Sequence, residues 1–86
     1  MPYIKVNRRI PIGTKAIDLG NQINNEGELN YAITQVILTV LARTSGTRYK
    51  DYNGIIGVLE CVKQELYRRR IAPYENQKMA QNGDVF

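Results

Sequence analysis

The sequence predicts an all-α protein built from three main helices and a short C-terminal helical segment. Two long segments carry apolar residues at three- and four-residue spacings, which is the period of an amphipathic helix. The capping pattern Asn25-Glu26-Gly27-Glu28 comes directly before the first of these segments. Ser45-Gly46 and Asn82-Gly83 supply stop signals where helical patterns end.

The first 13 residues are predicted to form a basic arm that proline and glycine interrupt. Its distinguishing residues are Lys5, Arg8, Arg9, Pro11 and Gly13. Apolar residues at alternate positions suit a short extended arm, although a helical turn also fits. A first, weak helix is expected from Thr14, which can cap it, to about Asn24.

The second helix is predicted to begin at the capping pattern, with the Asn25 side chain bonding the backbone N–H of Glu28. Its apolar stripe consists of Leu29, Ile33, Val36, Ile37, Val40 and Leu41. Ser45-Gly46 is expected to end it. A second line on the same helix consists of Tyr31, Gln35, Leu38 and Ala42. One intramolecular core does not need this second line, so it indicates a contact between chains.

A third helix of about twenty residues is expected to start at a cap on Asp51 or Asn53 and to reach Ala72. Its first half is apolar around nearly the whole circumference, which is typical of a buried central helix. The residues concerned are Ile55, Ile56, Val58, Leu59, Cys61 and Val62. Cys61 is therefore expected to be a buried packing residue.

Pro73 is expected either to end or kink the third helix or to begin a new segment as its first residue. Residues 74–81 are polar but compatible with a helix, which Asn82-Gly83 closes. The apolar end of the tail Asp84-Val85-Phe86 is expected to dock on a surface.

Length and charge limit the possible functions. A single domain over residues 1–86 is expected, with residues 14–86 as the helical body. A domain of this size buries only about 60% of its unfolded surface, so a symmetric homo-oligomer is expected. The net charge of +4 favours anionic partners. Without a leader-like segment or a membrane-spanning run, the expected location is the cytoplasm.

The residues that enzymes most often use for catalysis are scarce. The chain has no histidine and one cysteine, so the commonest general base and the usual zinc ligand spacings are missing. Glu60 and Glu65 are five residues apart and point to different sides of a helix, and the glycines form no phosphate-binding loop. We therefore expect no enzymatic activity, no metal and no cofactor.

The segment Tyr67-Arg68-Arg69-Arg70, followed by Tyr74, has the composition of a nucleotide-binding site. Guanidinium groups bind phosphate bidentately and tyrosine rings stack on bases. In an uninterrupted helix Tyr67, Arg70 and Tyr74 share one side. A solvated basic turn that complements the helix dipole explains the same residues equally well.

Asn30 and Tyr31 form a second candidate pair near the start of the second helix. The amide of Asn30 can both donate and accept, so it could read the edge of a base. A tyrosine that packs in an interface between chains is the more conservative interpretation of Tyr31.

Several stretches resemble a family of small bacteriophage proteins that has long been a domain of unknown function. They are residues 27–34, residues 56–69, Ala72-Pro73-Tyr74-Glu75 and Asn82-Gly83-Asp84-Val85. Residues 6–24 depart from the family pattern, because Pro11 and Gly13 interrupt the expected charged helix.

By analogy in size, origin and composition, this resemblance implies a phage sponge that sequesters a small anionic, cyclic nucleotide signal of bacterial immunity. The expected ligand-binding residues are then Asn30, Tyr31, Tyr67, Arg68, Arg69, Arg70 and Tyr74. The alternative is a phage regulator that binds nucleic acid or a host protein through the same basic face.

Overall fold

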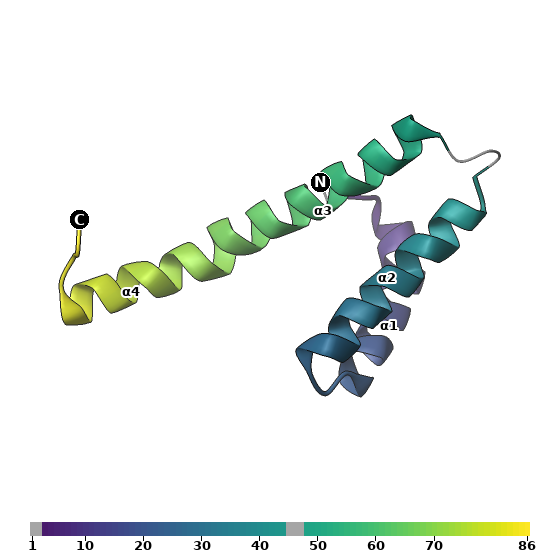
Figure 1. Ribbon diagram of the computed structural model, residues 1–86. Coiled ribbons are helices and arrows are strands. Elements are labelled where there is room, and N and C mark those ends of the chain that lie inside the picture. The colour runs from purple at the N-terminus through teal and green to yellow at the C-terminus, as the bar shows by residue number, and fades with distance from the viewer. Residues whose placement is uncertain (1–2, 45–47) are drawn as a thin grey trace. The chain divides into compact units, whose positions relative to one another are not determined.

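The computed structural model describes residues 3–44 and 48–86, which are helical apart from short connections (Figure 1). In chain order the elements are α1 (Val6–Gln22), α2 (Glu26–Ala42), α3 (Tyr49–Leu66), the π-helical turn η1 (Tyr67–Ile71) and α4 (Ala72–Asn82). These described stretches contain no strand. The predicted all-α fold is confirmed, with three helices of 17 or 18 residues and a shorter C-terminal one.

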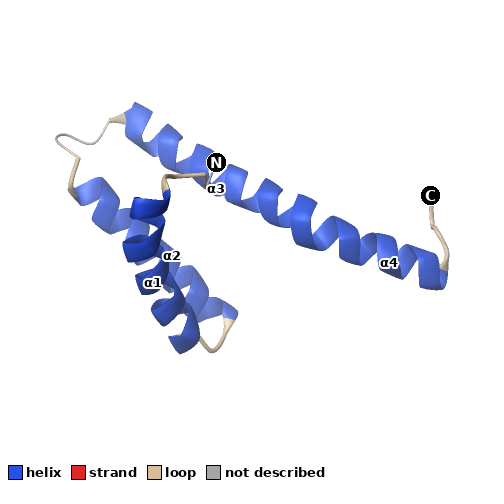
Figure 2. Ribbon diagram, turned by 180° about the vertical axis from the view of Figure 1, so that it is seen from behind, coloured by secondary structure: helices blue, strands red, loops and turns tan. Residues whose placement is uncertain are grey.

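The chain divides into two compact units, one reaching as far as Asp51 and the other comprising Tyr52–Phe86. The first contains α1 and α2, and Figure 1 shows that the chain reverses direction between them. The second consists of most of α3, η1, α4 and the C-terminal tail. In this second unit the three helical elements follow one another without a loop (Figure 2).

The first helix begins at Val6, eight residues before the predicted start at Thr14. Pro11 lies inside α1, where it removes the backbone bond to the carbonyl of Asn7 and its ring crowds that carbonyl. The hydroxyl of Thr14 does not cap the helix but donates to the carbonyl of Ile10, 2.7 Å away. Most of the predicted basic arm is therefore helical, and one interior proline near a helix start does not prevent this.

The start of α1 has little electrostatic support. The Lys5 side chain makes no capping hydrogen bond within the described residues, and the first turn contains no acidic residue. Arg8 and Arg9 lie instead near the positive end of the helix dipole, where cations are unfavourable.

The cap of α2 follows the prediction closely. Asn25 has extended backbone angles (φ −156°, ψ 173°), and its Oδ1 accepts a hydrogen bond from the N–H of Glu28 at 2.9 Å. The Glu28 carboxylate reaches back to the N–H of Asn24 at 2.8 Å, one residue earlier than in a standard capping box. The helix ends at Ala42, and the predicted stop at Ser45-Gly46 lies outside the described residues.

The third helix starts at Tyr49, slightly before the predicted caps. Asp51 contributes from inside the first turn, where its Oδ2 accepts a hydrogen bond from the N–H of Arg48 at 2.9 Å. A carboxylate at this position also suits the positive end of the helix dipole.

None of the described residues is buried. The predicted central helix is exposed on the single chain, with exposed fractions of 64% for Ile56 and 59% for both Val58 and Val62. Cys61, predicted to be buried, is also exposed. The apolar positions of α3 were predicted correctly, but their burial was not, because these side chains are exposed on one chain.

Candidate anion-binding site at the π-helical turn

The π-helical turn lies directly before Pro73. The N–H of Ala72 bonds the carbonyl of Tyr67, five residues back, whereas an α-helix bonds four residues back. In an α-helix the Pro73 ring would clash with the carbonyl of Arg69 and leave it without a donor. The wider turn accommodates the ring, and Pro73 becomes the second residue of α4. The prediction that Pro73 begins a new helical segment is therefore confirmed, since it lies in the first turn of α4. No loop separates α4 from η1.

Glu65 binds two of the three arginines. Its Oε1 accepts from Nη2 of Arg68 at 2.8 Å, and its Oε2 accepts from Nε of Arg69 at 2.7 Å. Only 19% of the Glu65 side chain is exposed, against 66% for Arg68 and 58% for Arg69. The hydrogen bond from Arg68 holds the pKa of the Glu65 carboxyl below its ordinary value of 4.5. Partial desolvation opposes this, and the bond from Arg69 adds to it.

Arg70 differs from its two neighbours. It forms no ion pair or hydrogen bond with any residue in the described ranges. Its guanidinium group, with five N–H donors in a planar fork, is therefore available to an external anion.

The two tyrosines of the candidate site engage different partners. The Tyr67 hydroxyl donates to Oε2 of Glu75 at 3.3 Å. Lys78 places its Nζ over the Tyr74 ring, 5.7 Å from the centroid, in a cation–π contact. Both rings remain about half exposed. The extra residue of the π-turn aligns Tyr67 with Glu75, whereas the predicted common side of Tyr67, Arg70 and Tyr74 assumed an uninterrupted α-helix.

Asn30 and Tyr31 lie on α2, in the other unit of the chain. The Thr34 hydroxyl donates to the carbonyl of Asn30 at 2.8 Å and approaches its Oδ1 at 3.5 Å. The Tyr31 side chain is 66% exposed. Both side chains are thus accessible from solvent, as a ligand or a partner chain would require.

Glu65, Glu75 and Lys78 contribute to the site although they were not among the predicted ligand residues. Glu65 lies three and four residues before the arginines, and Lys78 lies four residues after Tyr74, so ordinary helix spacing could have identified both. Glu75 lies eight residues after Tyr67, and this spacing indicates a contact only if the π-turn is known.

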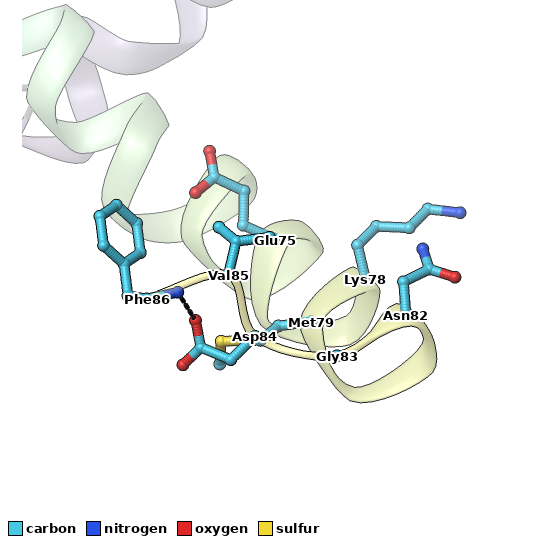
Figure 3. A pocket seen from close by; sticks show the side chains of 8 residues that line it. All are labelled: Glu75, Lys78, Met79, Asn82, Gly83, Asp84, Val85 and Phe86. Atoms are coloured by element: carbon cyan, nitrogen blue, oxygen red, sulfur yellow. Dashed lines mark hydrogen bonds between the residues drawn. The ribbon is translucent and has the colours of Figure 1, made fainter.

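Two shallow hollows lie on the second unit. One of about 250 Å³ is lined by Cys61, Gln64, Glu65 and Arg68. The other, of about 290 Å³, lies where the C-terminal tail turns back beside α4 (Figure 3).

The tail leaves the helix at Gly83, whose φ of +89° suits glycine, and the N–H of Phe86 bonds Oδ1 of Asp84 at 2.8 Å. Val85 and Phe86 are almost fully exposed, so the predicted docking of the tail does not occur on this chain.

Residues 3–44 and 48–86 contain neither a group of metal-binding side chains nor a helix that could span a membrane. No three His, Cys, Asp or Glu side chains within these ranges are grouped so that they could hold a metal ion. No helix there combines the length and the apolar character needed to cross a membrane.

Comparison with known proteins identifies a family but no characterised relative. No curated protein matches the chain, and no solved structure does. A family model does match, and it covers residues 1–85, including the segment 6–24 that departs from the expected pattern. The chain belongs to the family described as Domain of unknown function (DUF6899).

Proposed function

We propose that the protein sequesters a small anionic nucleotide at the π-helical turn and leaves it chemically unchanged. The guanidinium of Arg70, which has no ion-pair partner among residues 3–44 and 48–86, carries this proposal. In the sequence it lies between the arginine pair held by Glu65 and the exposed Tyr74. A free guanidinium binds phosphate through two parallel hydrogen bonds, and an exposed tyrosine ring offers a stacking surface to a base.

The remaining predicted residues take secondary roles in this proposal. Arg68 and Arg69 add positive charge beside the phosphate, and Tyr67 walls one flank. Asn30 and Tyr31, supplied by α2 of another chain in the homo-oligomer, read the base edge and cover the ring. Lys78, above Tyr74, contributes a further cation.

The chemistry of these residues suits binding better than turnover. A carboxylate whose pKa lies below 4.5, such as Glu65, is a weak general base at neutral pH. Arginine side chains remain protonated and cannot accept a proton. These properties support a protein that retains its ligand intact.

A homo-oligomer is part of the proposal. Apolar side chains on α2 and α3 are exposed on one chain, including Leu38 at 51% and Val58 at 59%. Apolar surface of this extent is typical of an interface, and symmetric homo-oligomers are its commonest form. Contact between chains would also enclose the arginines, which one chain leaves open.

In a bacterium such a protein would remove a cyclic nucleotide signal from the cytoplasm. The phage sponges that counter immune signalling work in this way, and the resemblance to a phage family motivates the analogy. It is an analogy of size and composition, so the ligand must be identified directly.

The proposal is tested by the thermal shift of the protein with cyclic dinucleotides and cyclic ADP-ribose isomers. A bound nucleotide raises the melting temperature and should be recovered unchanged after denaturation. Arg70→Ala should reduce the shift, whereas Lys15→Ala, which removes the same charge from α1, should preserve it. The absence of a shift across the whole panel, or recovery of a cleaved product in excess over protein, would refute the proposal.

Binding of nucleic acid is the second candidate, and a specific observation favours it. The arginines and tyrosines follow one another along a continuous helix and are open to solvent, as Arg68 (66%) and Arg69 (58%) illustrate. A strand of nucleic acid could follow such a face. Its affinity would then fall steeply with salt, and the nucleotide panel would give no shift. A host protein with an acidic surface could use the same face, and binding insensitive to added nucleic acid would identify it.

A further inference from the structure

Two of the site's three arginines are held by a carboxylate of the same helix. Glu65 directs one carboxylate oxygen at Arg68 and the other at Arg69, at 2.8 and 2.7 Å. Two oxygens of one phosphate would approach the same pair of guanidinium groups in the same way. Glu65 thus occupies one donor nitrogen of each guanidinium and offsets part of the positive charge that would attract a phosphate.

We propose that Glu65 competes with the ligand for Arg68 and Arg69, and that it makes the site bind phosphate compounds carrying two or more negative charges more tightly than singly charged ones. This inference rests on the proposed function and deepens it. A singly charged phosphodiester that displaced Glu65 would exchange one negative charge for another, with no net gain. A ligand with two charges can bind Arg70 with one phosphate and displace Glu65 with the other.

The contact is built to be displaceable. Both arginines are more than half exposed, and exposed ion pairs contribute little free energy because water and salt screen them. The carboxylate itself is largely covered, at 19% exposure, so it stays near both guanidinium groups. An external anion with a higher charge can therefore displace Glu65 from Arg68 and Arg69.

Glu60 provides a matched control one and a half turns earlier. Its carboxylate also contacts the residues three and four positions ahead, Lys63 at 3.1 Å and Gln64 at 3.2 Å. Its pKa is likewise lowered, first by the hydrogen bond from Lys63 and then by that from Gln64. Neither partner is an arginine, so Glu60→Gln removes a similar local contact and the same negative charge without freeing a guanidinium group.

The experiment compares wild type, Glu65→Gln and Glu60→Gln by calorimetric titration with two probes. Pyrophosphate carries several negative charges and no base, and cyclic AMP carries one charge. Wild type should bind pyrophosphate more tightly than cyclic AMP. Glu65→Gln should bind both probes more tightly than wild type, by about three- to tenfold for pyrophosphate, whereas Glu60→Gln should match wild type. Titrating ¹⁵N-labelled wild type should also shift the Arg69 Nε–Hε resonance as that group leaves Glu65.

The outcomes separate the two proposals. If Glu65→Gln binds pyrophosphate no more tightly than wild type, Glu65 is not a competitor and this inference fails, whatever the nucleotide panel shows. If Glu60→Gln gains as much as Glu65→Gln, the effect is one of net charge and the inference also fails. If Glu65→Gln gains affinity while no nucleotide binds wild type, Glu65 is a competitor for anions and the nucleotide function alone is lost.

Discussion

The hydroxyl of Tyr67 donates a hydrogen bond to Oε2 of Glu75, 3.3 Å away and eight residues further along the chain. Two turns of an α-helix take about 7.2 residues, so a residue eight positions ahead is rotated away from the first. Here the π-turn adds one residue, and two turns take eight. The contact therefore depends on the wide turn that precedes Pro73.

Replacing Pro73 with Ala should convert the π-turn to α-helix. The steric reason for the wide turn disappears, and residue 73 regains an N–H that can bond the carbonyl of Arg69. We expect a higher melting temperature, because proline in a helix interior costs up to about 3 kcal/mol, together with loss of the contact between Tyr67 and Glu75. The Tyr67 ring resonances in NMR spectra report that contact.

Pro11→Ala is the control for this variant, since Pro11 lies inside α1 without a π-turn. It should also raise the melting temperature but leave the Tyr67 resonances unchanged. Tyr67 resonances that stay the same in Pro73→Ala would mean that the π-turn has another cause.

Replacing Asn25 with Ala should destabilise α2 by about 1 kcal/mol, because the N–H of Glu28 loses its acceptor. Asn25→Asp retains an acceptor oxygen at the same position and should preserve stability. Chemical denaturation followed by circular dichroism measures both. Equal stability of the Ala and Asp variants would show that the cap contributes nothing measurable.

The contrast between Asn25 and Pro73 explains what the sequence could and could not predict. A cap is a contact between residues three positions apart, so its residue types and spacing are sufficient. Pro73 predicts a disturbance of the helix but not its form, and the predicted grouping of Tyr67 with Tyr74 depended on a register that the π-turn shifts by one residue. The start of α1 was predicted too late because Pro11 was expected to interrupt a helix that tolerates it.

Burial could not be predicted for a further reason. The apolar residues of α3 were recognised from their spacing, but spacing does not say which surface covers them. Val62 and Cys61 are exposed on one chain, so their environment depends on contacts beyond the local helix.

This exposure leads to a prediction about assembly. Gel filtration with light scattering at micromolar concentration should give a mass of two or more chains of 9.8 kDa each. Val62→Asp should lower that mass, since it places a charge on the apolar part of α3, whereas Gln77→Asp on polar α4 should leave it unchanged. A wild-type mass of 9.8 kDa would exclude the homo-oligomer.

The last prediction concerns Arg70 and Tyr74. Arg70→Ala should weaken nucleotide binding by about one to two decades, since a charge-assisted hydrogen bond contributes about 1.5–3 kcal/mol. Arg69→Ala should weaken binding less than Arg70→Ala does. Glu65 already holds the Arg69 guanidinium, so the ligand must displace Glu65 before it gains that contact. Tyr74→Ala should cost about 1–3 kcal/mol if the ring stacks on a base, and Tyr74→Phe, which keeps the ring, should cost little. All four variants should retain the helix content and mass of wild type, because these side chains lie beyond the apolar part of α3. Titration calorimetry with the nucleotide identified by thermal shift gives the four affinities. Arg70→Ala binding as tightly as wild type would leave the function in place but exclude Arg70 as its main phosphate contact.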